Sequence, residues 1–185
     1  MFTTSDLLVG VDVHRRNNVV QVMNGLGDSL AKPQQVANNR LGTAALIQQL
    51  ADLAHQGDFA HIHIAAEATG NYWLPFFCEL EQSPELAAWP VSLYPFNPKV
   101  IHKFRHSLGD WDKTDTLDAL VIAERLRLGR QLPYPFQVAV SFSDGRALPA
   151  AAHANPLPLP PGGRTGARQV PCTVAGLPSG QRLHG

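Results

Sequence analysis

Short apolar runs alternate with longer helical periodicities in the first part of the chain, residues 1–137. The runs that predict strands are rich in Val, Ile and Leu and are bounded by polar or turn residues. They are residues 7–13 and 19–23, a segment near Val36, and residues 61–67 and 91–94. The first two flank a polar turn and therefore predict a β-hairpin.

Four segments have apolar residues at helical spacing instead, namely 41–54, 72–81, 100–107 and 116–128. In the first of them Leu46, Leu50 and Leu53 recur at i, i+4 and i+7, which is typical of an amphipathic helix. Strands that alternate with helices predict an α/β fold in which a mixed sheet is flanked by helices. The initial hairpin makes that sheet partly antiparallel.

The character of the chain changes at residue 138. Residues 138–185 contain seven Pro, seven Gly and a single acid, Asp144, and they keep no apolar periodicity. Such a composition predicts a disordered tail. It is also typical of GC-rich coding DNA translated out of frame, and we favour that interpretation over a natural linker. The chain is therefore divided into a catalytic domain, 1–137, and a tail, 138–185.

Charge and composition exclude some classes of protein and leave others open. Fifteen basic and fifteen acidic residues cancel, so the chain lacks the strongly basic balance of many nucleic-acid binders. The sequence has neither a long apolar run nor the features of a secretory signal, which predicts a cytoplasmic protein. Cys78 and Cys172 lie far apart in segments of different character, and both are expected to be plain thiols.

Four acids stand where carboxylates need an explanation. Asp12 interrupts an apolar strand, Glu67 ends another, and Asp115 and Asp118 are spaced to share one helix face. Two alternatives involve no ligand. Asp12 could face solvent from a half-exposed strand, and Asp115 and Asp118 could form an acidic first helical turn, which the helix dipole favours. Together the four would suit Mg²⁺ or Mn²⁺, which prefer oxygen ligands, and hence metal-assisted phosphodiester chemistry.

Basic residues and histidines supply weaker signals. Four cations near the acids could contact phosphates, although a solvated basic helix face explains them nearly as well: Lys99, Lys103, Arg105 and Lys113. The histidines form no metal-binding spacing. His61 and His63 share a strand face, His102 and His106 share a helix face, and we interpret all four as structural.

Several motifs together resemble one family, the insertion-sequence transposases with an N-terminal DEDD, RuvC-like domain that act as bridge-RNA-guided recombinases. The motifs are Val-Gly-Val-Asp-Val at 9–13, Glu-Ala-Thr-Gly-Asn-Tyr-Trp at 67–73, Asn-Pro-Lys at 97–99, Phe-Arg at 104–105 and Lys-Thr-Asp-Thr-Leu-Asp-Ala at 113–119. The chain departs from the family at His14-Arg15-Arg16, where a small residue and Lys are frequent.

The resemblance implies an RNase H-like fold with Mg²⁺ or Mn²⁺ at the four acids. It also implies DNA as substrate, both the ends of the element and its target, a structured guide RNA, and a homo-oligomer in the full-length family. Family members have a second domain with a serine nucleophile, which nothing after Gln137 matches. We therefore expect a truncated or frameshifted chain, in which Ser141 and Ser143 have no catalytic role.

Three other functions remain as alternatives. Actin-like sugar kinases share a Gly-x-Asp before a hairpin, but residues 14–18 contain no glycine to bind phosphate. A stand-alone RuvC-like nuclease specific for branched DNA would use the same acids and the same metals. An inactive remnant of a transposase would fold and catalyse nothing.

Overall fold

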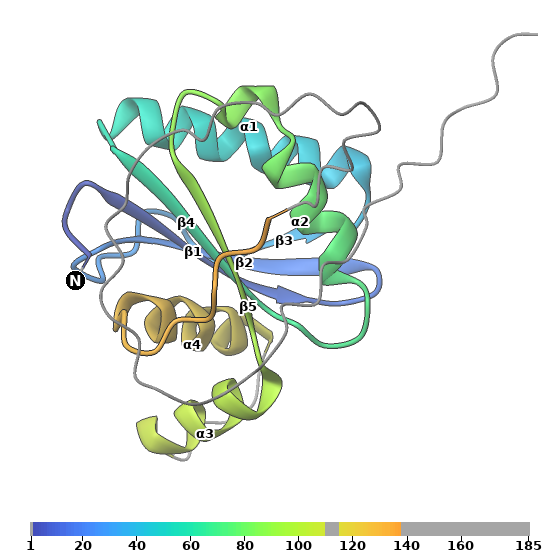
Figure 1. Ribbon diagram of the computed structural model, residues 1–185, viewed down its shortest axis with the longest axis vertical. Helices are drawn as coiled ribbons and strands as arrows, with labels where there is room; N and C mark the ends of the chain where they lie inside the picture. The colour runs from blue at the N-terminus through green and yellow to red at the C-terminus, as the bar shows by residue number, and fades with distance from the viewer. Residues whose placement is uncertain (1, 110–114, 138–185) are drawn as a thin grey trace, which may run out of the picture. The chain divides into compact units, whose positions relative to one another are not determined.

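The computed structural model describes residues 2–109 and 115–137 (Figure 1). Its sheet has five strands, in the spatial order β3-β2-β1-β4-β5. They are β1 (Asp6–Val13), β2 (Asn17–Asn24), β3 (Gln34–Ala37), β4 (His61–Glu67) and β5 (Val91–Phe96). Strand β2 is antiparallel to β1 and β3, whereas β4 is parallel to both β1 and β5. The predicted mixed sheet with an initial hairpin is confirmed.

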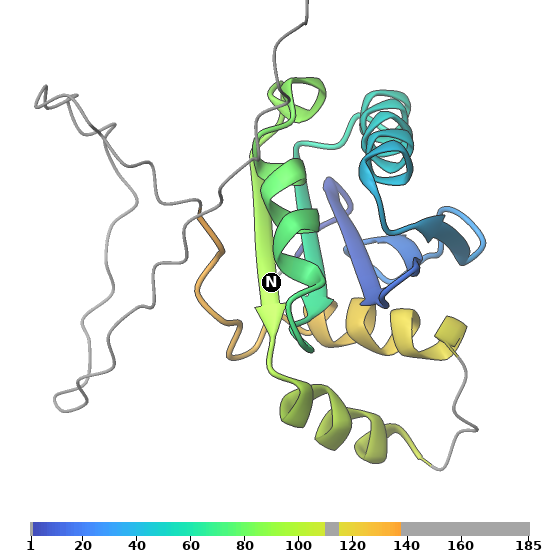
Figure 2. The same ribbon diagram turned by 90° about the vertical axis from the view of Figure 1, so that its right-hand side faces the viewer.

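Helices cover both faces of this sheet. They are α1 (Arg40–Gln56), α2 (Trp73–Glu81), α3 (Pro98–Leu108) and α4 (Asp115–Arg127), and a 3-10 turn, η1 (Pro84–Leu86), follows α2. Helices α1 and α2 pack on one face and α4 on the other, with α3 beyond α4 (Figure 1). The turned view in Figure 2 shows α3 and α4 on the same side of the sheet. The α/β fold class is confirmed.

Local sequence explains where these elements begin. The Asn39 side chain accepts a hydrogen bond from the Gly42 amide at 2.9 Å and caps α1. Asn97 caps α3 in the same way and is followed by Pro98 in the first helical position, where a missing N–H costs nothing. Strand β5 is two residues longer than predicted because it is an edge strand, in which Pro95 is tolerated.

The central strand β1 is buried on both faces. Leu7, Val9 and Val11 belong to the core that α1 and α2 cover, whereas Leu8 belongs to the core under α4. Gly10 also faces α4, and a Cβ at this position would lie 2.7 Å from the Cβ of Ala123. Two carbons normally pack about 3.5–4.0 Å apart, so the absence of a side chain at Gly10 lets α4 approach β1 closely.

Some predictions fall outside the described residues or are corrected. The tail 138–185, with Ser141 and Ser143, and Lys113 lie outside them. Cys78 is disulfide-bonded, so the prediction of a plain thiol there is wrong; Cys172, too, lies outside the described part of the chain. Among the described helices, none is long and apolar enough to cross a membrane.

Candidate active site

Two of the predicted acids come from neighbouring parallel strands. Val11 of β1 lies opposite Ala66 of β4, so Asp12 and Glu67 follow as the next residues of the two strands. Successive side chains of a strand point to opposite faces, which places both acids on the α4 side of the sheet. This edge, at the carboxyl ends of the strands, is where α/β sheets usually bind ligands.

Helix α4 brings the third acid. Asp118 directly precedes Ala119, whose backbone packs against Gly10, so close contact between α4 and β1 fixes its position. Asp115 is the first residue of α4, one turn earlier than Asp118. Residues three apart are neighbours on a helix surface, although the Asp115 side chain itself is not described. Carboxylates from three separate elements thus converge.

These acids share one cleft of about 340 Å³. Its lining residues come from β1, β4, α3, α4 and the turns that follow β1 and β4, and they are Asp12, Val13, His14, Glu67, Thr69, Pro98, Ile101, His102, Arg105 and Asp118. Only 12% of the Asp12 side chain and 10% of the Asp118 side chain are exposed. A charged carboxylate that is this buried requires compensation by cations or hydrogen-bond donors.

Two basic side chains supply that compensation. The Nε2 atom of His14 lies 2.9 Å from Oδ2 of Asp12, and the guanidinium of Arg105 forms an ion pair with Asp118. Glu67 accepts a hydrogen bond of 2.6 Å from the Thr69 hydroxyl. Three carboxylates in a cleft, two of them paired with the side chains of His14 and Arg105, form a donor set of hard oxygens that fits a divalent cation such as Mg²⁺ or Mn²⁺.

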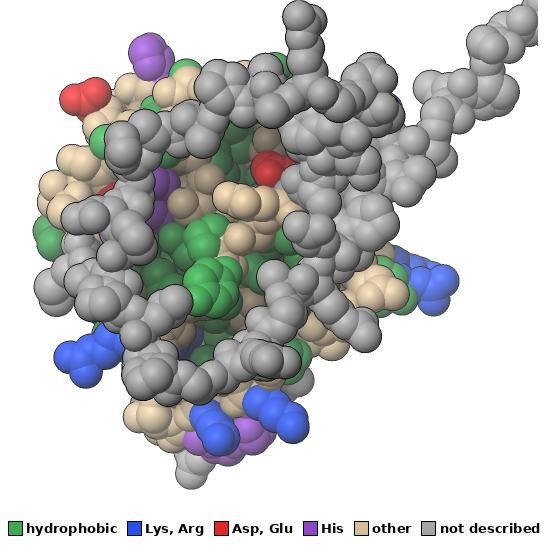
Figure 3. Space-filling view, viewed as in Figure 1, with side chains coloured by type: hydrophobic (Ala, Val, Ile, Leu, Met, Phe, Trp, Pro, Cys, Tyr) green, Lys and Arg blue, Asp and Glu red, His purple; other side chains and the backbone are tan. Residues whose placement is uncertain are grey.

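The predicted phosphate contacts are divided between the cleft and the surface. Arg105 lines the cleft, whereas Lys99 and Lys103 are exposed on α3. Figure 3 shows basic side chains beside histidine on the surface over α3. A cationic rim next to an acidic cleft is the arrangement that would hold a phosphate backbone near a metal site.

The cleft also contains residues that the sequence did not single out as ligands. His14 and Thr69 each contact an acid that lies two residues earlier in the chain. His102, predicted to be structural, also lines the cleft. The signal that could have identified His14 is its place in the turn directly after β1, since an i, i+2 pair can meet where a strand ends.

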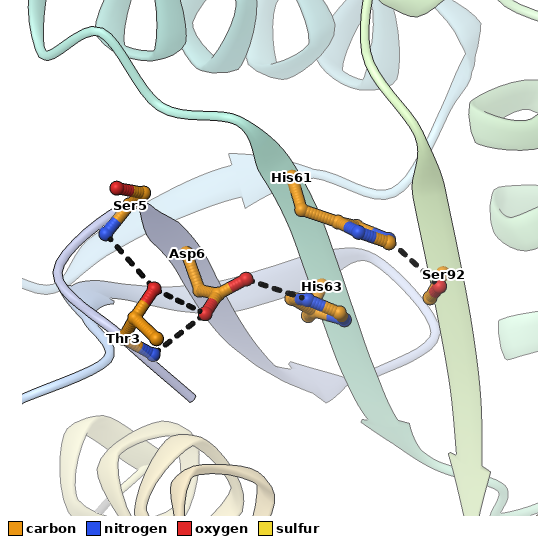
Figure 4. Close-up of polar contacts among 6 residues, drawn as sticks. All are labelled: Thr3, Ser5, Asp6, His61, His63 and Ser92. Carbon is orange, nitrogen blue, oxygen red and sulfur yellow. Dashed lines mark hydrogen bonds and ion pairs between the residues drawn. The ribbon is translucent and has the colours of Figure 1, made fainter. Parts of the chain in front are cut away.

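A second polar cluster lies on the same face at the opposite end of the strands (Figure 4). Asp6, His61 and His63 offer ligand atoms within 4.8 Å of one another. The His63 Nε2 lies 3.2 Å from Asp6 Oδ1, and the His61 Nε2 lies 3.1 Å from the Ser92 hydroxyl. The two imidazoles stack at 4.0 Å and 14°, so their lone pairs run nearly parallel and do not converge on one ion. We therefore keep the structural interpretation for this cluster.

Burial shifts the protonation of the second cluster. It lowers the pKa of His63 to about 4, with a smaller contribution from His61, while the hydrogen bond and charge of Asp6 oppose the change. The Nδ1 atom of His63 is buried and has no hydrogen-bond partner among the described residues. Protonation would place an N–H there without an acceptor, which explains why the neutral ring is favoured.

Burial also acts on the other two groups of the cluster. It lowers the pKa of His61. For Asp6, burial alone would raise the pKa, but hydrogen bonds from Thr3 and His63 outweigh it and hold the pKa below its ordinary value. Asp6 is therefore charged and both histidines are neutral at pH 7.

Comparison with known proteins adds family information to this geometry. Residues 9–141 match the transposase family of the IS110 type with a DEDD domain. The pilin gene-inverting proteins of Moraxella bovis and Moraxella lacunata are each 35% identical to the chain over 74 residues. Those residues amount to 38% of this chain and 20% of either relative, so the chain spans only a part of their length.

One solved structure similar to this chain is that of T. thermophilus RuvC in complex with a Holliday junction substrate. The similarity covers 70% of this chain and 99% of the RuvC chain, with a TM-score of 0.45 and 12% sequence identity. The family match covers well over half of the 185 residues. It includes Asp12, Glu67, Asp115 and Asp118. The chain belongs to the IS110 family of DEDD transposases.

Proposed function

We propose that Asp12, Glu67, Asp115 and Asp118 hold Mg²⁺ or Mn²⁺, and that the domain serves cleavage and transfer of phosphodiester strands during transposition of an insertion sequence. The observation that carries this proposal is the convergence of carboxylates from β1, β4 and α4 on one cleft, which Arg105 also lines and which adjoins the basic surface of α3. Family membership supports the choice of DNA as the substrate.

The residues in and around the cleft would have different roles. A bound divalent ion would polarise a phosphodiester and activate the attacking oxygen. The four carboxylates would supply its ligands, and the packing of Ala119 on Gly10 would keep those from α4 in register with Asp12. Arg105 neutralises Asp118 before an ion binds, and once released from it would be free to contact a phosphate. Lys99 and Lys103 would hold the DNA backbone at the rim.

Further parts of the proposal rest on the likeness to the family. They are a structured guide RNA, a homo-oligomer in the full-length protein and a second domain that supplies a serine nucleophile. Action in the cytoplasm, the division at residue 137 and the translation of residues 138–185 out of frame rest on the sequence pattern instead and belong to the proposal as well. The nucleotide sequence downstream of the codon for Gln137, read in all three frames, tests these last two points directly.

DNA binding by the purified chain tests the proposed function. A labelled DNA duplex and a labelled four-way junction are titrated with the protein in Mg²⁺, in Mn²⁺ and in EDTA, and both gel shifts and strand cleavage are recorded. We expect binding that strengthens with the metal, and Glu67→Gln, which keeps the side-chain shape, should remove the metal-dependent part. The proposal would be contradicted if the wild type bound DNA equally well in EDTA and in metal, and if Glu67→Gln bound DNA as the wild type does.

The same titration separates the alternatives. Cleavage of the junction by the chain alone, with no cleavage of the duplex, would favour a stand-alone nuclease for branched DNA. Metal-dependent binding without cleavage would favour a recombinase domain that needs further parts of a longer protein. A folded chain that cleaves neither DNA, and that binds them only weakly and without dependence on metal, would identify an inactive remnant.

A further inference from the structure

His14 lies beside the acidic site in a fixed position. It follows Val13 directly at the end of β1, and its carbonyl accepts a hydrogen bond of 2.7 Å from the Asn38 side chain. The backbone N–H of Asn38 in turn donates a hydrogen bond of 2.8 Å to the carbonyl of Arg16. The turn between β1 and β2 is thus tied to the segment after β3, which holds the His14 backbone at the cleft.

The imidazole of His14 forms a hydrogen bond with Asp12. Its Nε2 lies 2.9 Å from Oδ2 of Asp12, and both residues line the cleft that contains Glu67 and Asp118. Two adjacent ligands of an octahedral ion, each about 2.1 Å from it, lie about 3.0 Å apart. The observed contact is a hydrogen bond, and its length is such that an ion could take the place of the shared proton with little movement of the nitrogen or the oxygen.

We infer that His14 is a nitrogen ligand of the divalent ion and that it makes the site selective for Mn²⁺ over Mg²⁺. In the Nδ1–H tautomer the Nε2 lone pair would point at the ion that Asp12 binds. About half of the side chain is exposed, so the ring has room for the small rotation that this requires. Imidazole suits transition ions, whereas Mg²⁺ takes oxygen ligands almost alone.

This inference rests on the proposed metal site and sharpens it. If the site contained carboxylates alone, its preference between Mg²⁺ and Mn²⁺ would be that of any site built from oxygen ligands. The nitrogen adds affinity for Mn²⁺ only. The turn after β1 would therefore set which ion the domain uses.

Electron spin-echo spectroscopy of the Mn²⁺-loaded chain tests the inference without any activity measurement. A nitrogen bound directly to Mn²⁺ gives ¹⁴N modulation, which we expect in the wild type and in His102→Gln, a matched change of another histidine in the cleft. His14→Gln should still bind Mn²⁺ but lose the modulation. Its Mn²⁺ affinity should fall about tenfold, while its Mg²⁺ affinity changes less than about twofold.

Two results would overturn the inference. One is a wild-type chain that binds Mn²⁺ without ¹⁴N modulation. The other is modulation that persists in His14→Gln or disappears in His102→Gln. Either of these leaves the carboxylate site intact, whereas a wild-type chain that binds no Mn²⁺ at all would refute the proposed function together with the inference.

Discussion

Gly10→Ala tests whether the packing of α4 on β1 builds the site. The new Cβ would lie 2.7 Å from the Cβ of Ala123 and closer than 3 Å to backbone atoms of Ala119 and Ala123. Helix backbone cannot rotate away, so α4 must move by roughly 1 Å to restore normal contact. Overpacking of this kind costs about 1–3 kcal/mol of unfolding free energy. Because Asp118 adjoins Ala119, the same shift should displace Asp118 from Asp12.

Two measurements test this prediction for Gly10→Ala. Urea denaturation monitored by circular dichroism should show the loss of stability, and calorimetric titration with Mn²⁺ should show at least about tenfold weaker binding, since metal–oxygen distances tolerate little change. Gly129→Ala is the control. An alanine there meets only ordinary contacts, but φ is 63°, so about 1–2 kcal/mol of strain should lower stability without moving Asp118. Normal Mn²⁺ affinity in Gly10→Ala would refute the reasoning.

Two further predictions concern charge. The folded-state pKa of His63 is about 4, below the ordinary 6.5, so the folded state binds fewer protons between these values and stability should fall as pH drops through this window. Between pH 7.5 and 5 the shift of His63 should lower the free energy of unfolding by about 2 kcal/mol in urea titrations. His63→Leu should remove this part of the pH dependence and leave the part that the lowered pKa of His61 contributes, whereas His55→Gln, which alters an exposed histidine, should leave the loss unchanged. Arg105→Gln removes the cation paired with Asp118, so Mn²⁺ should bind several-fold tighter in a calorimetric titration. The variant also loses one phosphate contact, so the slope of the logarithm of the DNA-binding constant against the logarithm of salt concentration should become less steep by about 0.9. A pH dependence in His63→Leu as large as that of the wild type, or unchanged Mn²⁺ affinity in Arg105→Gln, would contradict the respective assignment.

Local patterns predicted most of the fold. The apolar runs of β1 and β4 are distinctive because both strands are buried on both faces, and the polar turn between residues 13 and 19 could only reverse the chain. The sequence also singled out Asp12 within one apolar strand and Glu67 at the end of another, and their convergence follows from parallel pairing. Edge strand β5 was predicted too short, since Pro95 is normally a strand breaker and only its edge position permits it.

Contacts between distant segments could not be predicted in this way. Arg105 and Asp118 are joined only because α3 and α4 lie on the same side of the sheet, and nothing in their spacing indicates an ion pair. Asp6 and His63 are 57 residues apart and meet through the register of β1 and β4. Periodicity determines the face that a side chain occupies, but its partners on that face depend on how whole elements pack.

The proposed function requires that the four acids together bind divalent metal in one site. Calorimetric titration with Mn²⁺ of the wild type and of Asp12→Asn, Glu67→Gln, Asp115→Asn and Asp118→Asn tests it most directly. These changes keep side-chain shape while removing the charge, and circular dichroism verifies that each variant is folded. We predict measurable binding in the wild type and at least about tenfold weaker binding in every variant. Unchanged binding in all four folded variants would contradict the claim.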